Sequence, residues 1–372
     1  MRIAKLVSIA TLACAVRTSA TEWNVIEHDG RDYVSFGNVA EFYHFAEYNH
    51  DDRTVSLRSD RRGIRAQADS SEIYINGVRF FTYFPIAGKG DESLISATDV
   101  GKIVEPVLRP SRLRDARKVE TVVLDPGHGG TDQGTANTWG TEKGYALDVA
   151  LTAREQLLRA GFKVEMTRSG DVGLSLEERI DFANRFPNAV FISIHFNSAT
   201  GGSGVESYAL APEGVASNAA PGENHSSETD VVRNPGNDQD GRNLALTAAV
   251  HAAVLSRLAP FDRGIRHARF KVLRDIKVPA LLIEGGFLSD PVEGQRIATQ
   301  QYRQQLGAAI AQGVQAYSAA VSFHSENTPG SFALVRANLP PHARSITEPL
   351  TANQTAEPAP PDEPTVSIDG GE

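Results

Sequence analysis

Cysteine is almost absent from this chain, which has a single cysteine, Cys14, among 372 residues. One cysteine cannot form an intrachain disulfide, and it cannot supply a cysteine cluster for a metal ion. Any metal site must therefore use histidine and carboxylate ligands. The hydrophobic share of 41% is enough for one large or two medium globular domains with buried cores.

Basic residues are outnumbered, with 37 Lys and Arg against 46 Asp and Glu and a formal net charge of −9. Binding to nucleic acid through its phosphate groups requires a basic face. A nucleic-acid partner is therefore disfavoured.

Several enzyme motifs are also missing. The glycine-rich segment at 127–130 has neither the Gly-Lys-Ser/Thr ending of a phosphate-binding loop nor the Gly-x-Gly-x-x-Gly spacing of a dinucleotide site. No Gly-x-Ser-x-Gly elbow follows an expected strand, which disfavours a serine hydrolase. These glycines must serve another purpose.

Long apolar runs are missing apart from residues 6–16, which are too few to span a bilayer as a mature helix. Two basic residues precede this run and small residues follow it at 18–20. The pattern predicts a signal peptide over residues 1–20, and export to the periplasm or the exterior. Two alternatives stay open, namely a buried N-terminal helix and a lipid anchor at Cys14.

Residues 23–115 contain short strand-like runs separated by turn residues. The Asn76-Gly77 pair between two such runs favours a tight β-hairpin, so we expect a small β-rich domain. Three segments resemble the small domain known from the N-terminus of copper amine oxidases: GRDYV at 30–34, ING at 75–77 and LIS at 94–96. Despite that name, nothing in the segment indicates copper.

From residue 119 to 320 strands alternate with amphipathic helices, which predicts an α/β fold with a twisted, mostly parallel sheet and helices on both faces. Strands are expected at 121–124, 162–167, 189–194, 205–210, 270–273 and 279–283. Helices are expected from about residue 145 to a cap at Gly161, after a capping box of Ser175 and Glu178, at 242–258 and at 302–318. The apolar stripes of the first two helices are expected to comprise Leu147, Ala150, Leu151, Leu157 and Leu158, and then Leu176, Ile180 and Ala183.

Three of these strands run into side chains suited to metal binding or acid–base chemistry. His128 lies in the glycine loop after the first strand, and His195 and Glu284 follow two later ones. The carboxyl ends of strands in an open α/β sheet converge on the ligand crevice. Glu142, just before a helix, can reach back to the same place. Two histidines and a glutamate are a known ligand set for catalytic zinc.

Each of these residues alone has an ordinary structural explanation. A histidine in a glycine loop is more often structural, and Glu142 alone would be a solvated carboxylate stabilised by a helix dipole. Glu284 is harder to explain in this way, because an unpaired carboxylate at a buried strand end is costly. The zinc hypothesis therefore depends on the residues being brought together.

Five motifs resemble, in order, those of the zinc-dependent N-acetylmuramoyl-L-alanine amidases: VVLDPGHGG at 122–130, EK at 142–143, LEER at 176–179, SIHFN at 193–197 and IEGGFLS at 283–289. The resemblance covers residues 119–320. It implies that His128, Glu142 and His195 bind zinc and that Glu284 is the catalytic glutamate.

The resemblance implies hydrolysis of the peptidoglycan amide bond between N-acetylmuramic acid and L-alanine. Zinc lowers the pKa of bound water from 15.7 to about 7 and polarises the carbonyl. Glu284 would accept the water proton and deliver it to the departing amine. Asn197 is a candidate to orient the substrate. Phe196 and Gly285 depart from the family, which more often has a small and an aliphatic residue there, so the pocket is expected to differ in shape.

The polar segment 212–240 is long for a loop in a compact domain, and such loops are usually functional or disordered. Some relatives carry an insertion at a similar place that blocks the active site until a partner binds. One hypothesis is self-inhibition relieved by a protein activator, with Glu213, Glu223, His225 and Glu228 as groups that reach the metal. The alternative is a surface loop, since the Pro, Gly and Asn content disfavours a stable blocking helix.

Taken together, the sequence predicts an exported amidase whose partner is peptidoglycan, with a β-rich domain that binds the wall or another protein. A disordered Pro-rich tail is expected at 322–372. Two other functions stay open, a zinc hydrolase of the same fold acting on another amide or peptide, and a wall-binding protein without catalysis. The four intact site residues disfavour the second.

Overall fold

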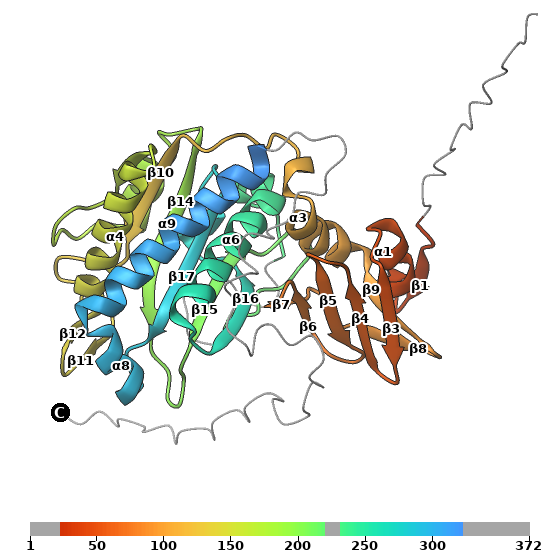
Figure 1. Cartoon of the computed structure of the whole chain (residues 1–372). Coiled ribbons are helices and arrows are strands. Elements are labelled where there is room, and N and C mark those ends of the chain that lie inside the picture. The colour runs from red at the N-terminus through yellow and green to blue at the C-terminus, as the bar shows by residue number, and fades with distance from the viewer. Residues whose placement is uncertain (1–22, 220–230, 323–372) are drawn as a thin grey trace, which may run out of the picture.

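The computed structural model describes residues 23–219 and 231–322 (Figure 1). The expected signal peptide and the tail after residue 322 lie outside the described residues, as do Glu223, His225 and Glu228. No helix within the described ranges combines the length and apolar character needed to cross a bilayer. The described chain forms a β-rich N-terminal part and an α/β part (Figure 1).

One mixed sheet of eleven strands runs through both parts, and its α/β half has the order β13-β10-β14-β17-β15-β16. In chain order these strands are β10 (Thr121–Pro126), β13 (Lys163–Met166), β14 (Ala189–Asn197), β15 (Val205–Leu210), β16 (Asp262–Ala268) and β17 (Ala280–Phe287). Neighbouring strands of this half are parallel except β15 and β17, which are antiparallel. The predicted mostly parallel sheet is therefore confirmed.

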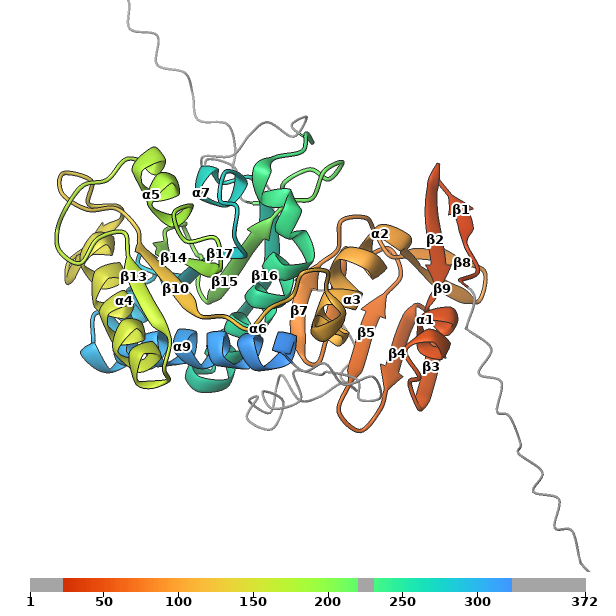
Figure 2. The same cartoon turned by 90° about the horizontal axis from the view of Figure 1, so that it is seen from above.

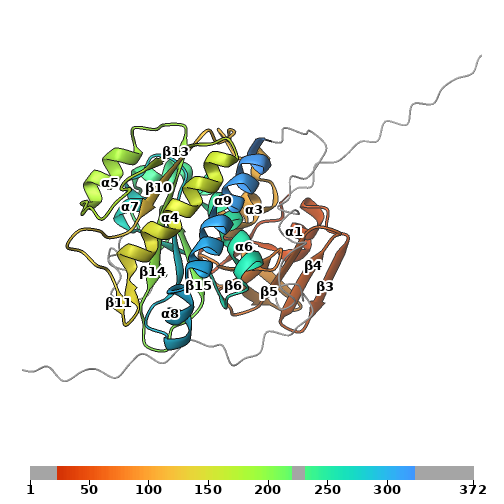
Figure 3. The ribbon, with the colours of Figure 1, turned by 60° about the vertical axis from the view of Figure 1, so that its left-hand side comes forward.

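Helices cover both faces of this half of the sheet, as predicted. One face carries three long helices that lie side by side, α4 (Glu142–Arg159), α6 (Asp240–Leu258) and α9 (Gln300–Ser322) (Figure 3). The other face carries α5 (Leu176–Ala183) and α7 (Lys271–Arg274) (Figure 2). The short helix α8 (Pro291–Ile297) connects β17 to α9.

Alternate residues of each strand enter different cores, because successive side chains point to opposite faces of a sheet. Phe191 on β14 and Leu282 on β17 pack in the core beneath α5 and α7. Their neighbours Ile192 and Ile283 pack in the larger core beneath α4, α6 and α9. This alternation decides which face the functional side chains occupy.

The N-terminal part is the predicted β-rich domain. Its strands are β1 (Ile26–His28), β2 (Arg31–Ser35), β3 (Glu47–Asp51), β4 (Thr54–Arg58), β5 (Gly63–Gln67), β6 (Glu72–Ile75), β7 (Val78–Phe81), β8 (Ala87–Lys89) and β9 (Glu92–Ser96). Its helices are α1 (Phe36–Phe42), α2 (Ala97–Asp99), a π-helical turn (Val100–Val104) and α3 (Glu105–Leu108).

Two features of this domain follow from local sequence and from contact with the α/β part. The predicted Asn76-Gly77 hairpin joins β6 to β7, with positive φ angles of 54° and 83° that suit these residues. Strand β7 adds to the edge of β16, with Phe80 opposite Ile265, so the two parts share one sheet. An ion pair of 2.8 Å between Lys102 and Asp240 also links them.

The strand predicted at 270–273 is wrong, because this segment contains helix α7 and the strand precedes it as β16. Strand β16 was overlooked because it carries Arg263 and Arg266, which are unusual in a buried strand. Both arginines form ion pairs with Glu206 on the neighbouring strand β15. The charge that hides the strand in the sequence is thus compensated by a long-range contact.

The first predicted helix, α4, begins at Glu142 rather than near residue 145, and its predicted apolar stripe is partly wrong. Leu151 and Leu158 are exposed. The buried face comprises Tyr145, Ala146, Val149, Ala150, Ala153 and Leu157. Small residues line it because α9 approaches closely: a Cβ added at Gly307 would lie 2.7 Å from the Val149 carbonyl oxygen.

Other local predictions are confirmed. The capping box of Ser175 and Glu178 opens α5, although Leu176 is exposed at the first position of that helix. Gly161 follows the end of α4 with a φ of 88°. The helix predicted at 302–318 is present as α9, whose buried residues include Leu306, Ala309, Ile310, Val314 and Tyr317.

Candidate metal centre and active-site edge

A row of polar side chains crosses the sheet near the ends of three strands. His195 on β14 is paired with Glu284 on β17, and Glu284 is paired with Glu206 on β15. Paired residues project from the same face. His195 follows Phe191 by four residues, and Glu284 follows Leu282 by two. Because side chains alternate between the two faces along a strand, His195 and Glu284 project from the same α5/α7 face as Phe191 and Leu282. His195 and Glu284 lie near the carboxyl ends of β14 and β17.

Strand ends were predicted to bring His128, His195 and Glu284 together. His195 and Glu284 lie inside their strands, however, because β14 and β17 continue to Asn197 and Phe287. The three residues come together at one end of the sheet, as expected, and only the positions at which the strands end differ from the prediction.

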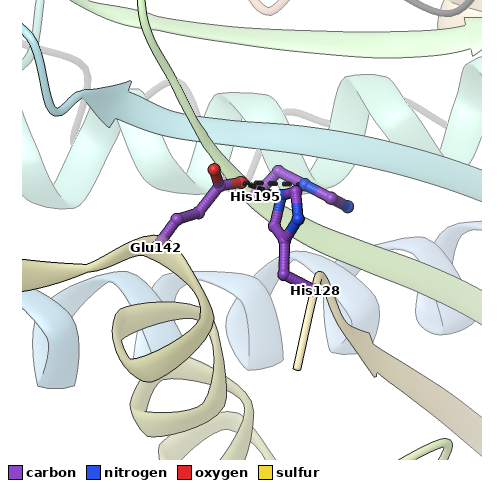
Figure 4. Close-up of side chains that lie close together, drawn as sticks. All are labelled: His128, Glu142 and His195. Atoms are coloured by element: carbon purple, nitrogen blue, oxygen red, sulfur yellow. Dashed lines mark hydrogen bonds and ion pairs between the residues drawn. The ribbon is translucent and has the colours of Figure 1, made fainter. Parts of the chain in front are cut away.

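Glu142 joins His128 and His195 in a compact cluster (Figure 4). The Oε1 atom of Glu142 lies 2.9 Å from Nε2 of His128 and 2.9 Å from Nδ1 of His195. One ligand atom from each residue lies within 4.8 Å of the others. The carboxylate is buried, whereas the two imidazole side chains are 23% and 22% exposed. Such a partly open set of two imidazoles and a carboxylate can hold a divalent metal ion.

Helix α4 and two backbone amides hold Glu142 in place. The residue begins the helix, where the helix dipole favours negative charge. Its Oε2 accepts a hydrogen bond from Thr135 N at 2.9 Å, and its Oε1 accepts one from Phe196 N at 3.1 Å. Burial raises the pKa of the carboxyl, but hydrogen bonds from the two histidines outweigh burial and hold this pKa below its usual range. Glu142 is thus ionised, as a metal ligand must be.

His128 is oriented by a carboxylate that the sequence analysis did not identify. Its Nδ1 atom lies 2.8 Å from Oδ2 of Asp132, and such a carboxylate on the far ring nitrogen fixes the orientation of a ligand histidine. Burial lowers the pKa of His128, but Glu142 and Asp132 together raise it above the usual value. The only sequence signal for Asp132 was its place in the same glycine-rich loop.

Two buried arginines hold the backbone of this loop, in which His128 has a left-handed φ of 59°. Arg179 on α5 donates to the His128 carbonyl at 2.7 Å, and Arg168 donates to the Gly127 carbonyl at 2.7 Å. Asp125 accepts a 2.7 Å hydrogen bond from Arg179, and these two side chains are 1% and 4% exposed. This buried pair had no predicted role, although Arg179 belongs to the LEER motif.

Two glycines leave the room that the cluster occupies. A Cβ added at Gly127 would lie 2.2 Å from the His195 ring. A Cβ added at Gly134 would lie 2.6 Å from both the Glu142 carboxylate and the His128 ring, and Gly134 has a φ of 61°. The glycine-rich loop therefore serves close packing around the candidate metal ligands.

A family model described as N-acetylmuramoyl-L-alanine amidase matches residues 122–316, which is more than half of the chain. The chain belongs to this amidase family. The matched range includes all four predicted site residues, His128, Glu142, His195 and Glu284.

Named relatives of the amidase family share about a third of the aligned residues with this chain. Identity is 33% over 229 residues to the N-acetylmuramoyl-L-alanine amidase AmiC of Neisseria meningitidis, covering 56% of this chain and 55% of that protein. It is 31% over 219 residues to AmiA of Escherichia coli, covering 53% of this chain and 75% of that protein. The crystal structure of an N-acetylmuramoyl-L-alanine amidase from Clostridium difficile is 33% identical, with 54% and 97% coverage and a TM-score of 0.44.

The two departures from the amidase family pattern compensate each other sterically. Phe196 and Gly285 are next to each other on β14 and β17, one position after the His195–Glu284 pair. A Cβ added at Gly285 would lie 3.0 Å from the Phe196 ring and 2.5 Å from Leu306. The large residue at one position thus fills the space that a side chain at the other would need.

We therefore expect Gly285→Val to destabilise this amidase less in a Phe196→Ala background than in the parent protein. Overpacking alone costs about 1–3 kcal/mol of unfolding free energy, and residues in contact couple by about 0.5–3 kcal/mol. Denaturant unfolding of the four proteins of the cycle measures this coupling. As a control, the unfolding free-energy losses of Gly285→Val and of Leu57→Ala in the distant β-rich domain should add. If the losses of Gly285→Val and Phe196→Ala also add, the steric account is contradicted.

Asn197, predicted to orient the amidase substrate, donates its Nδ2 hydrogen to Oε1 of Glu206 at 2.7 Å. Its oxygen accepts a hydrogen bond from Ser198 N at 2.6 Å. The amide is thus held firmly at the sheet edge. A direct contact with substrate stays a prediction.

The described parts of segment 212–240 pack against the amidase domain. Arg269, itself buried, donates hydrogen bonds to the carbonyl oxygens of Pro212 and Val215 at 2.7 and 2.6 Å. Glu213, a predicted candidate to reach the metal, lies 3.9 Å from Arg233 in an exposed ion pair. It does not belong to the His128–Glu142–His195 cluster.

Proposed function

We propose that this protein is a zinc-dependent hydrolase of the peptidoglycan amide bond that joins N-acetylmuramic acid to L-alanine. One observation carries the proposal. The His128–Glu142–His195 cluster lies beside Glu284 at the edge of the sheet, in a chain of the N-acetylmuramoyl-L-alanine amidase family. The chain spans about half (55%) of the length of its Neisseria relative.

Zinc fits the three residues that would hold it. Two imidazole nitrogens and one carboxylate oxygen are a donor set for catalytic zinc, which keeps one coordination position for water or substrate. The side chains of His128 and His195 are 23% and 22% exposed to solvent, which is consistent with such an open position. When bound at such a site, zinc supplies Lewis-acid chemistry that makes water a nucleophile near neutral pH and polarises a carbonyl.

Glu284 is proposed as the general base and acid. It lies beside His195 in the sheet and is 9% exposed, so its carboxylate belongs to a largely dry part of the site. During attack on the amide carbon it accepts a proton from water. As the carbon–nitrogen bond breaks, it donates that proton to the departing amine, so protons balance over the cycle.

We further propose that the protein acts outside the cytoplasm after export, in the periplasm or at the exterior. Residues 1–20 would be the signal peptide, residues 119–320 the catalytic domain, and the β-rich domain at 23–115 a module that binds the wall or another protein. Lipid attachment at Cys14 and a protein activator stay hypotheses.

Digestion of purified peptidoglycan by the mature protein tests the proposal, with mass spectrometry of the released muropeptides. We expect zinc-dependent release of fragments with new L-alanine amino ends, its loss with a chelator, and its recovery when zinc is added back. Lost release in a His195→Ala variant that no longer retains zinc would tie the activity to the cluster.

A protein that binds zinc but leaves peptidoglycan intact would contradict the proposed substrate, unless segment 212–240 inhibits it. A variant without residues 220–230 distinguishes these cases. This shorter deletion keeps the contacts of Arg269 with Pro212 and Val215, which removal of the whole segment would destroy. Unchanged turnover in the deletion variant would contradict self-inhibition, and a sharp rise would support it.

A further inference from the structure

A buried carboxylate next to Glu284 binds two arginines. Oε2 of Glu206 lies 3.0 Å from Nε of Arg263 and 3.4 Å from Nε of Arg266. The Glu206 side chain is 3% exposed, whereas those of the two arginines are 26% and 23% exposed. Oε1 of the same carboxylate accepts hydrogen bonds from Asn197 at 2.7 Å and from the Tyr208 hydroxyl at 2.9 Å. Both carboxylate oxygens are thus held.

The arginines lie on the face of the sheet that carries the candidate active site. Glu206 is paired with Glu284, and its contact with Arg263 places this guanidinium group beside the same row. Arg263 is the extra residue of a bulge, since Val205 pairs with Asp262 and Glu206 with Gly264. Strands β17, β15 and β16 are successive neighbours (Figure 2). Strand β16 is therefore two strand spacings, or roughly 10 Å, from β17.

Two arginines share the single carboxylate of Glu206. Arg266 has further partners, since its Nη1 donates to the Asn218 carbonyl at 3.0 Å and its guanidinium stacks 4.3 Å from the Phe81 ring. Within the described residues, Nε to Glu206 is the one hydrogen bond of the Arg263 side chain. Its guanidinium also lies 4.7 Å from the centre of the buried Phe287 ring. Arg263 is therefore fixed in position and keeps donors for a ligand.

We infer that Arg263 binds a carboxylate of the stem peptide, an inference that rests on the proposed function. The outer nitrogens of a guanidinium group donate two parallel hydrogen bonds to a carboxylate, and a side chain already held by Glu206 and Phe287 loses little freedom on binding. An extended peptide covers about 3.3–3.6 Å per residue. A distance of roughly 10 Å from Glu284 therefore places this carboxylate within about the first three residues of the peptide.

The test compares two N-acetylmuramoyl-L-alanyl peptides that differ only in having free or amidated carboxylates. The parent enzyme should show about 10- to 100-fold higher kcat/KM for the free carboxylates, the range expected for hydrogen bonds to charged groups. Arg263→Gln should lose this preference by slowing on the free-carboxylate peptide alone. The matched control is Arg303→Gln, which also has an ion pair, with Asp148 at 2.9 Å, and an aromatic contact, with Tyr145 at 5.0 Å.

Equal activity of the parent enzyme on both peptides would overturn the inference. So would an equal loss on both peptides in Arg263→Gln, which would indicate a purely structural ion pair with Glu206. Calorimetry can also measure how tightly a Glu284→Gln variant binds each of the two peptides. This compares the free and amidated carboxylates without turnover. If the parent enzyme cleaves neither peptide but binding still depends on the carboxylate and on Arg263, the proposed reaction fails and the carboxylate site stands. Carboxylate-independent binding refutes the site.

Discussion

A Glu284→Gln variant should retain zinc and yet lose about 10²- to 10⁴-fold in kcat for muropeptide release, the usual contribution of a general acid–base group. Glutamine has nearly the same shape as glutamate but cannot accept the proton of the attacking water. Glu284 is a strand neighbour of His195 and is not one of the three clustered candidate ligands. The substitution therefore separates proton transfer from metal binding.

The measurement combines metal analysis of the purified variant with initial rates on purified peptidoglycan. Glu155→Gln serves as a control, because Glu155 is exposed on α4 and pairs with Arg159 away from the cluster. It should match the parent in both zinc content and rate. Zinc loss in Glu284→Gln would mean that this carboxylate supports the metal, and a near-normal rate would show that another group transfers the proton.

Arg179→Met should produce the largest loss of stability, about 3–5 kcal/mol of unfolding free energy. Removing one partner of a buried ion pair leaves the other charge uncompensated, and here the remaining charge is Asp125, which is 1% exposed. The variant also removes the hydrogen bond from Arg179 to the His128 carbonyl. Because this bond holds the ligand loop, zinc affinity should fall about 10- to 100-fold, as for other outer-sphere partners.

Equilibrium denaturant unfolding and zinc titration of the parent and variant proteins measure both effects. The control is Arg159→Met, whose exposed i,i+4 pair with Glu155 should contribute less than about 1 kcal/mol. Asp125→Asn added to Arg179→Met should cost less than the sum of the single variants, because the uncompensated charge is gone. A loss below 1 kcal/mol in Arg179→Met would contradict the role assigned to the pair.

Predictions from the sequence were reliable where they needed only residues close together in the chain. The Ser175–Glu178 capping box, the Asn76-Gly77 hairpin and the turn at Gly161 each involve a few neighbouring residues. Their hydrogen bonds are set by backbone geometry that those side chains favour. Apolar runs also marked the strands of the α/β sheet, except for β16.

Predictions failed where a distant part of the chain decided the environment. Leu151 and Leu158 were expected inside, but α9 packs against the small residues of α4 and leaves both leucines exposed. Strand β16 was missed because its arginines are compensated by Glu206, which is 57 residues before Arg263. No periodicity within β16 indicates that compensation.

For the candidate site, the sequence by itself predicted four residues. His128, His195 and Glu284 were predicted because their motifs come at apolar strands whose carboxyl ends must meet at one end of a sheet, and Glu142 was predicted because it comes just before a helix and can reach back to that place. Only the tertiary structure decided how that edge is completed. The order and register of the strands place Glu206 between Glu284 and Arg263, and folding brings Asp125 against Arg179 across 54 residues. Such contacts depend on which strands and helices become neighbours, which local sequence patterns do not specify.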